Sequence, residues 1–113
     1  MPKFALLLHE SQQAFAGLSP DQIQAIIQKY IDWVSRLQSQ GHFVLGEKLE
    51  SDGRAVRRTA GRLVTDRLFA ESKEVVGGLM IVEADSYDHA VALTEGSPHF
   101  ERGWIEIRQV DRP

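Results

Sequence analysis

The strongest constraint on the fold is a long stretch of helical periodicity near the N-terminus. Apolar residues recur at helical spacing over residues 23–37, which predicts an amphipathic helix of about twenty residues. Ser19 is placed to cap this helix, Pro20 suits its first position, and Gln22 completes a capping box with Ser19. Gly41 is placed to end it.

The other segments have strand-like patterns, apart from one shorter helix. That helix is expected to begin at Asp85 or Ser86 and to end at Gly96 and Pro98. A hairpin is expected around Ala60-Gly61, followed by a loop over residues 65–74. The expected strands cover residues 4–9, 43–49, 55–59, 62–65, 79–82 and 104–110.

The resulting order of elements is β-α-β-β-β-β-α-β. Without the extra hairpin, this order is the split β-α-β pattern of ferredoxin-like α+β folds. Two helices cover only one face of such a sheet. In the last strand Trp104, Glu106, Arg108 and Val110 share a face, opposite Ile105 and Ile107. We therefore expect the face that carries Trp104 to meet a second copy in a homodimer.

Composition sets the class of protein. The chain has 113 residues, of which 42% are apolar and 26% charged, which is typical of one globular domain spanning residues 1–113. A net charge of −3 argues against direct nucleic-acid binding. No apolar run approaches the length of a membrane helix, and the short apolar stretch at residues 4–8 is too short for a signal-peptide core. We therefore expect a cytoplasmic protein with no membrane partner.

Several short motifs resemble the YCII-related, DGPF-type domain family. They are Leu6-Leu7-Leu8-His9-Glu10, Leu18-Ser19-Pro20, Gly46-Glu47-Lys48-Leu49, Val64-Thr65-Asp66, Phe69-Ala70-Glu71-Ser72-Lys73-Glu74, Gly77-Gly78, Ser97-Pro98-His99 and Ile105-Glu106-Ile107-Arg108. Their order and spacing cover nearly the whole chain. The resemblance implies a ferredoxin-like subunit that dimerises through its sheets into a dimeric α+β barrel. It also implies a suspected regulatory link with alternative sigma factors.

Two features depart from the family pattern. The family's Asp-Gly-Pro-Phe stands here as Asp66-Arg67-Leu68-Phe69, which replaces a tight-turn sequence by a cation and a leucine. The enzyme-like YCII proteins use a His/Asp pair whose histidine lies in the first helix. Residues 20–40 contain no histidine, so that pair does not transfer to this chain.

Two of the four histidines are candidates for proton transfer near neutral pH. His9 ends the first expected strand, and His99 follows Pro98 in the loop before the last strand. Phe100 is placed to give His99 an apolar wall that lowers its pKa, whereas a nearby Glu47 or Asp66 would raise that pKa. His99 is expected at the surface. The alternative for both histidines is an ordinary hydrogen-bonded residue at a strand end or in a loop.

Two carboxylates complete the catalytic candidates. Glu47 shares a face with Leu45 and Leu49 if the strand alternates regularly, so we expect it to be half-buried. It acts either as a general base or as the partner of Arg57 or Arg108 in an ion pair across the sheet. Asp66 either caps the turn that follows it or serves as the acid of a His/Asp pair.

Four more residues are candidates for ligand binding: Arg57, Phe69, Lys73 and Glu74. The last three belong to a charged segment that precedes Gly77-Gly78, where a backbone without side chains lets a ligand or a second subunit approach closely. The alternative is a solvated connector.

No cofactor is expected. The chain lacks cysteine, His-Glu-x-x-His spacing, a Gly-x-Gly-x-x-Gly motif and a phosphate loop, and His9, Glu10 and His99 form at best a weak metal set. Two functions remain. One is a small-molecule pocket with cofactor-free acid/base chemistry, such as that of a lyase or hydrolase. The other is a non-catalytic dimeric module that regulates or scaffolds a protein partner, for example in transcription initiation.

Overall fold

The computed structural model describes residues 1–68 and 73–112. The predicted order of elements is confirmed, with a short 3-10 helix added before the last strand. The elements are β1 (Lys3–Ser11), α1 (Pro20–Ser39), β2 (Phe43–Lys48), β3 (Arg54–Thr59), β4 (Arg62–Arg67), β5 (Glu74–Glu83), α2 (Tyr87–Leu93), η1 (Pro98–Glu101) and β6 (Gly103–Gln109).

The ends of α1 follow from local sequence. The Ser19 hydroxyl accepts a hydrogen bond from the Gln22 amide at 3.1 Å, and the Gln22 side chain accepts one from the Ser19 amide at 2.8 Å. This is the predicted capping box. Gly41 follows the C-terminus at a φ of 79°, which glycine adopts without strain. No helix in the described ranges is long and apolar enough to cross a membrane.

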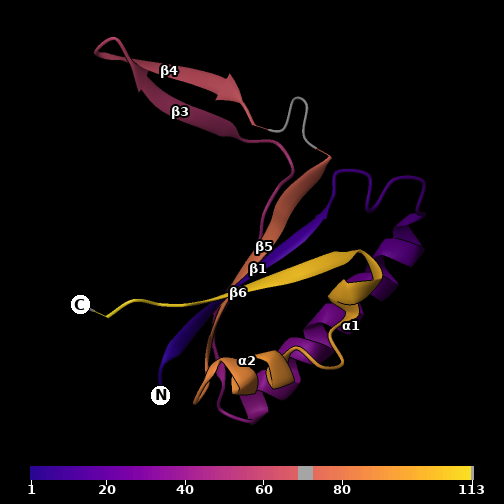
Figure 1. Cartoon of the computed structure of the whole chain (residues 1–113). Helices are drawn as coiled ribbons and strands as arrows, with labels where there is room; N and C mark the ends of the chain where they lie inside the picture. Colours follow the sequence, from indigo (N-terminus) through magenta and orange to yellow (C-terminus); the bar gives the residue numbers. More distant parts are fainter. Residues whose placement is uncertain (69–72, 113) are drawn as a thin grey trace.

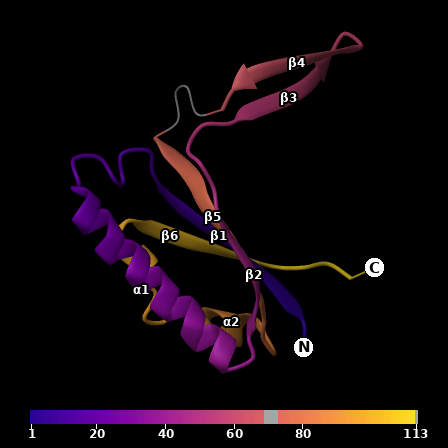
Figure 2. The same ribbon diagram turned by 180° about the vertical axis from the view of Figure 1, so that it is seen from behind.

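Four strands form one antiparallel sheet in the order β2-β5-β1-β6 (Figures 1 and 2). The order is that of a ferredoxin-like fold, in which the two β-α-β units interleave. The two helices lie on the same side of this sheet (Figure 2). The mixed α+β class expected from the sequence is therefore confirmed.

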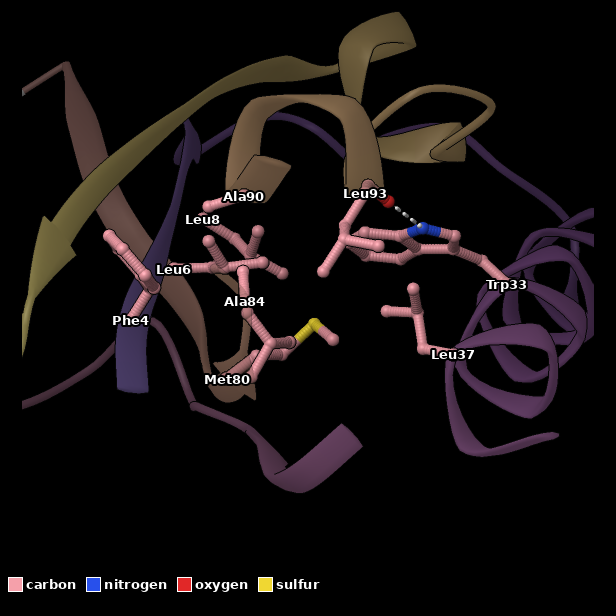
Figure 3. Close-up of a cluster of buried hydrophobic side chains, with 10 residues drawn as sticks. Phe4, Leu6, Leu8, Trp33, Leu37, Met80, Ala84, Ala90 and Leu93 are labelled. Atoms are coloured by element: carbon pink, nitrogen blue, oxygen red, sulfur yellow. Dashed lines mark hydrogen bonds between the residues drawn. The ribbon is translucent and has the colours of Figure 1, made fainter. Parts of the chain in front are cut away.

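The hydrophobic core lies between this sheet and the two helices (Figure 3). Phe4, Leu6 and Leu8 point toward the helices from alternate positions of β1, and all three are buried. Trp33 of α1 is 2% exposed, and its indole N–H donates to the Leu93 carbonyl at 3.1 Å. The indole thus ties α1 to the end of α2.

No element of the described residues covers the opposite face of the sheet, which is called the open face here. It receives Ala5, Leu7 and His9 from β1, and the cross-strand partners of these residues on β5 and β6. Trp104 is 46% exposed on this face and Leu45 is 43% exposed. The prediction that Trp104 lies away from the helices is confirmed, whereas Val110 lies just beyond the end of β6.

The hairpin of β3 and β4 projects away from the main sheet (Figures 1 and 2). It turns at Ala60 and Gly61, whose φ angles of 51° and 77° are those of the tight turns that join two antiparallel strands. The predicted hairpin is confirmed, but its second strand is longer than expected. It continues through Arg67, so the expected loop from residue 65 was wrong at that end.

Candidate functional site

His9 and Glu106 form a hydrogen-bonded pair on the open face. Nε2 of His9 lies 2.9 Å from Oε1 of Glu106, and the two side chains are 18% and 34% exposed. Because a carboxylate only accepts, Nε2 carries the hydrogen of the neutral ring and Nδ1 keeps its lone pair. Nδ1 has no hydrogen-bond partner among the described residues, so the pair presents a base to the open face.

Trp104 packs on this pair. Its ring lies parallel to the His9 imidazole, with the centroids 4.0 Å apart and an interplanar angle of 4°. The two residues are direct cross-strand partners on β1 and β6. The indole N–H donates to Oε2 of Glu74 at 2.8 Å, so the carboxylate at the start of β5 fixes the orientation of the ring. Glu74 is one of the predicted ligand-binding residues.

Glu47 lies on the same open face but is not half-buried as expected. It pairs with Leu79 of β5, which in turn pairs with Leu7 of β1, so two strands separate Glu47 from the strand of Glu106. Its side chain is exposed because no helix covers this face and because β2 is an edge strand. Within residues 1–68 and 73–112 it makes no ion pair, so the expected bridge to Arg57 or Arg108 is absent there.

His99 is buried, and the expectation of a surface histidine was wrong. It is 1% exposed in η1, where its Nε2–H donates to the His9 carbonyl at 2.7 Å and its Nδ1 accepts from the Tyr30 hydroxyl at 2.9 Å. Burial lowers the pKa of His99 below its ordinary value, chiefly because the charged ring would lose its water. Phe100 supplies no wall, since it is 55% exposed.

The side chains around His99 form a buried polar cluster on the helix side of β1. Burial raises the pKa of the Tyr30 hydroxyl, whereas the Arg102 charge opposes that rise. Glu10 is 7% exposed and lies against Gly77, where a Cβ would collide with its carboxylate. Position 77 therefore requires glycine, because a larger residue would leave no room for the Glu10 side chain of the same chain. The cluster lies on the opposite side of β1 from the His9 imidazole.

Asp66 and Arg57 lie together on the projecting hairpin. Nη1 of Arg57 is 3.5 Å from Oδ2 of Asp66, and both side chains are about two-thirds exposed, at 69% and 66%. Asp66 is inside β4, so the expected turn cap was wrong. The structure brings neither residue into contact with His9 or His99 within the described ranges.

The charged segment before β5 is described only in part. Lys73 accepts a backbone hydrogen bond from the Gln12 amide at 3.2 Å, which joins the segment to the end of β1. Phe69 lies outside the described residues. The side chains of His9, Glu10 and His99 do not converge, and the described ranges contain no cluster of three or more metal-binding side chains.

Two surface depressions stand apart from the predicted site residues. One of about 680 Å³ is lined by the chain termini, including Pro2 and Val110. The other, of about 340 Å³, lies between α1 and α2 and is lined by Trp33, Arg36 and Glu95, among others. Neither includes His9, Glu47, Asp66 or His99. These two depressions therefore lie away from the His9–Glu106 pair.

Sequence reasoning found His9 but missed its partner Glu106. The alternation of β6 places Trp104 and Glu106 on one face, which is the available signal, but the register between β1 and β6 decides that they meet His9. Tyr30 was missed as well, because an aromatic residue in the apolar stripe of α1 is indistinguishable from ordinary core.

Comparison with known proteins gives a family and a fold. A search of solved structures finds 5-chloro-2-hydroxyhydroquinone dehydrochlorinase of Burkholderia phenoliruptrix in complex with 2,5-dihydroxybenzoquinone, with a TM-score of 0.53. That match is 15% identical and covers 98% of this chain and 95% of that chain, so it supports the fold alone. A search of curated proteins finds no significant match. The sequence model of the YCII-related domain family matches residues 3–112, and the chain therefore belongs to the YCII-related domain family.

Proposed function

We propose that this chain is a homodimer that encloses a small-molecule site between two open faces, with His9 as the general base. The observation that carries the proposal is the His9–Glu106 hydrogen bond of 2.9 Å on a sheet face that no helix covers. A dimer through this face forms the dimeric α+β barrel that the family resemblance implies.

The pair is suited to cofactor-free acid/base chemistry. Glu106 holds the Nε2–H of His9, fixes the tautomer and stabilises the imidazolium that forms when Nδ1 takes a proton. In an elimination, Nδ1 takes a proton from carbon and the electron pair of the broken C–H bond expels the leaving group. In a hydrolysis, Nδ1 takes a proton from water, the water oxygen bonds to an electrophilic carbon of the ligand, and the bond from that carbon to the leaving group breaks. In either reaction His9 then returns its proton to the leaving group or to solvent.

The proposed ligand is a small ring or carboxylate metabolite. Trp104 offers a broad aromatic surface that is 46% exposed beside the pair, and flat rings stack well on such surfaces. A solved protein of similar fold is a dehydrochlorinase that holds 2,5-dihydroxybenzoquinone, a ring with polar substituents. Glu74 orients Trp104, and Glu47 lies on the same face as a charged group at the edge of the site.

His99 has a positioning role in this proposal. Its Nε2–H holds the carbonyl of His9, so the buried ring fixes the end of β1 from the helix side. Both of its nitrogens are occupied by hydrogen bonds, which leaves none free to exchange a proton with a ligand. His9 is therefore the better of the two histidines for proton transfer.

A thermal-shift screen against small aromatic and carboxylate metabolites tests the proposal. We expect a hit that raises the unfolding temperature of the wild type, with the shift lost in His9→Ala and reduced in Glu106→Gln. Lys29→Ala on the exposed side of α1 is a matched control and should keep the full shift. If no ring or carboxylate compound binds, or if His9→Ala binds as tightly as the wild type, the acid/base proposal fails and the non-catalytic regulatory module is favoured.

A further inference from the structure

The hairpin of residues 54–67, called the arm here, is an exposed structure with little to stabilise it within its own chain. Its two strands form a separate two-stranded sheet, and such hairpins are only marginally stable in water. Val56 is 59% exposed and Leu63 is 67% exposed, on the same side of the arm. The radius of gyration is 16.2 Å, against about 13 Å for a compact chain of this length.

The arm also concentrates positive charge. It contains five arginines and one aspartate, a net charge of +4, so the rest of the chain carries −7 out of the total of −3. Arg57 pairs with Asp66, and Arg54 and Arg67 both approach Asp52 at its base. Arg58 and Arg62 have no carboxylate partner among the described residues. The strand register places Arg58 on the same side as Val56 and Leu63, whereas Arg62 faces the other side. Apolar and cationic side chains thus lie together on one exposed side of the arm.

We propose that the arm packs against the acidic body of a second copy of this chain. The arm points away from its own body, so its complement must come from another molecule (Figures 1 and 2). Each copy carries both an arm of charge +4 and a body of charge −7, so a two-fold pair satisfies both arms at once. This contact adds to the sheet-face contact proposed above, and the experiments below separate the two.

A second copy fits the arm better than a nucleic acid does. Phosphates would pair with Arg58 and Arg62, but they offer no apolar surface for Val56 and Leu63. The body of charge −7 would also repel a polyanion that approaches the arm. Two arms placed side by side would repel each other, so the arm should meet the body of the other copy.

The absence of cysteine makes a direct test possible, because a single introduced cysteine carries a spin label at one known place. Leu63→Cys, spin-labelled on the arm and without isotope, is mixed with wild-type chain labelled with ¹⁵N. We expect the label to broaden amide signals in the body of the ¹⁵N-labelled copy, outside residues 54–67. Broadening confined to the arm, or no broadening in a sample that contains dimers, would overturn the proposal while leaving the sheet-face dimer intact.

Charge reversal gives an independent measure. The double variant Arg58→Glu and Arg62→Glu should weaken self-association by about tenfold or more in sedimentation equilibrium at low salt. The matched control, Lys29→Glu and Arg112→Glu, changes the net charge equally on exposed residues outside the arm and should associate as the wild type does. Equal weakening of self-association in the arm variant and in the control would show that net charge causes the effect, and it would overturn the proposed arm contact. So would a wild-type chain that stays monomeric, or one whose arm binds a DNA or RNA oligonucleotide in place of a second copy.

Discussion

At the scale of single residues, His9 and His99 occupy different environments, which the sequence alone did not distinguish. They meet through the His9 carbonyl, yet one imidazole faces the open face and the other is buried under α1. The motif Ser97-Pro98-His99 indicates a stiff backbone, but it contains no information about the helix that covers it. The burial of His99 depends on Tyr30, which is 69 positions away in the chain.

His99→Ala should destabilise the protein by about 3 kcal/mol, because it opens a cavity and leaves the Tyr30 hydroxyl and the His9 carbonyl without their partner. Urea denaturation measures this change. Phe100→Ala is a matched control in the same 3-10 helix, and it should cost less than about 0.5 kcal/mol because Phe100 is exposed. Equal losses in the two variants would contradict the buried role of His99.

Acid should weaken the contribution of His99 to stability. Its pKa is lowered in the folded state, so below its ordinary value of 6.5 the unfolded chain binds more protons than the folded chain. The free energy of unfolding therefore falls as the pH decreases through that value. His99→Gln keeps one donor and one acceptor but does not titrate. Between about pH 8 and about pH 5, the free energy of unfolding should fall more for the wild type than for His99→Gln. Equal losses in the two proteins would contradict the lowered pKa of His99.

At the scale of elements, α1 is the part of the fold best predicted from sequence. Its cap, first residue and end lie in neighbouring positions, so local chemistry decides them. Ser19→Ala should cost about 1 kcal/mol of unfolding free energy, because one amide at the start of the helix loses its acceptor. Ser35→Ala, at an exposed position near the C-terminal end of the same helix, should cost nothing measurable in the same thermal or urea unfolding experiment. A similar loss in both variants would argue against the capping box.

The strands include features that local sequence predicts and features that depend on how distant strands pair. The hairpin turn was predictable, because Ala60-Gly61 is a local turn signal, whereas the exposure of Glu47 was not. Alternation groups Glu47 with Leu45 correctly, but only the sheet order reveals that their shared face is the open one. The pairing of His9 with Glu106 is likewise a matter of register between strands that are distant in sequence.

At the scale of the whole molecule, the proposed small-molecule site depends on what covers the open face. Trp104 and Leu45 are both more than two-fifths exposed there, and we propose that a second copy packs on this face. A second copy on this face would place His9 in an enclosed site, because the two faces together would exclude water from it. The number of helices predicted from sequence that one face of the sheet is left uncovered by them, whereas the position of the His9–Glu106 pair on that face came from the structure.

Sedimentation equilibrium at tens of micromolar protein, with wild type and Leu45→Glu compared side by side, tests whether the open face is a dimer interface. We expect the wild type to be a dimer and the variant to be a folded monomer, because the new carboxylate would be buried without a partner in the sheet-face contact. Val91→Glu, on the exposed side of α2, is the matched control and should remain dimeric. A wild-type chain that sediments as a monomer under these conditions would contradict the proposed enclosed site.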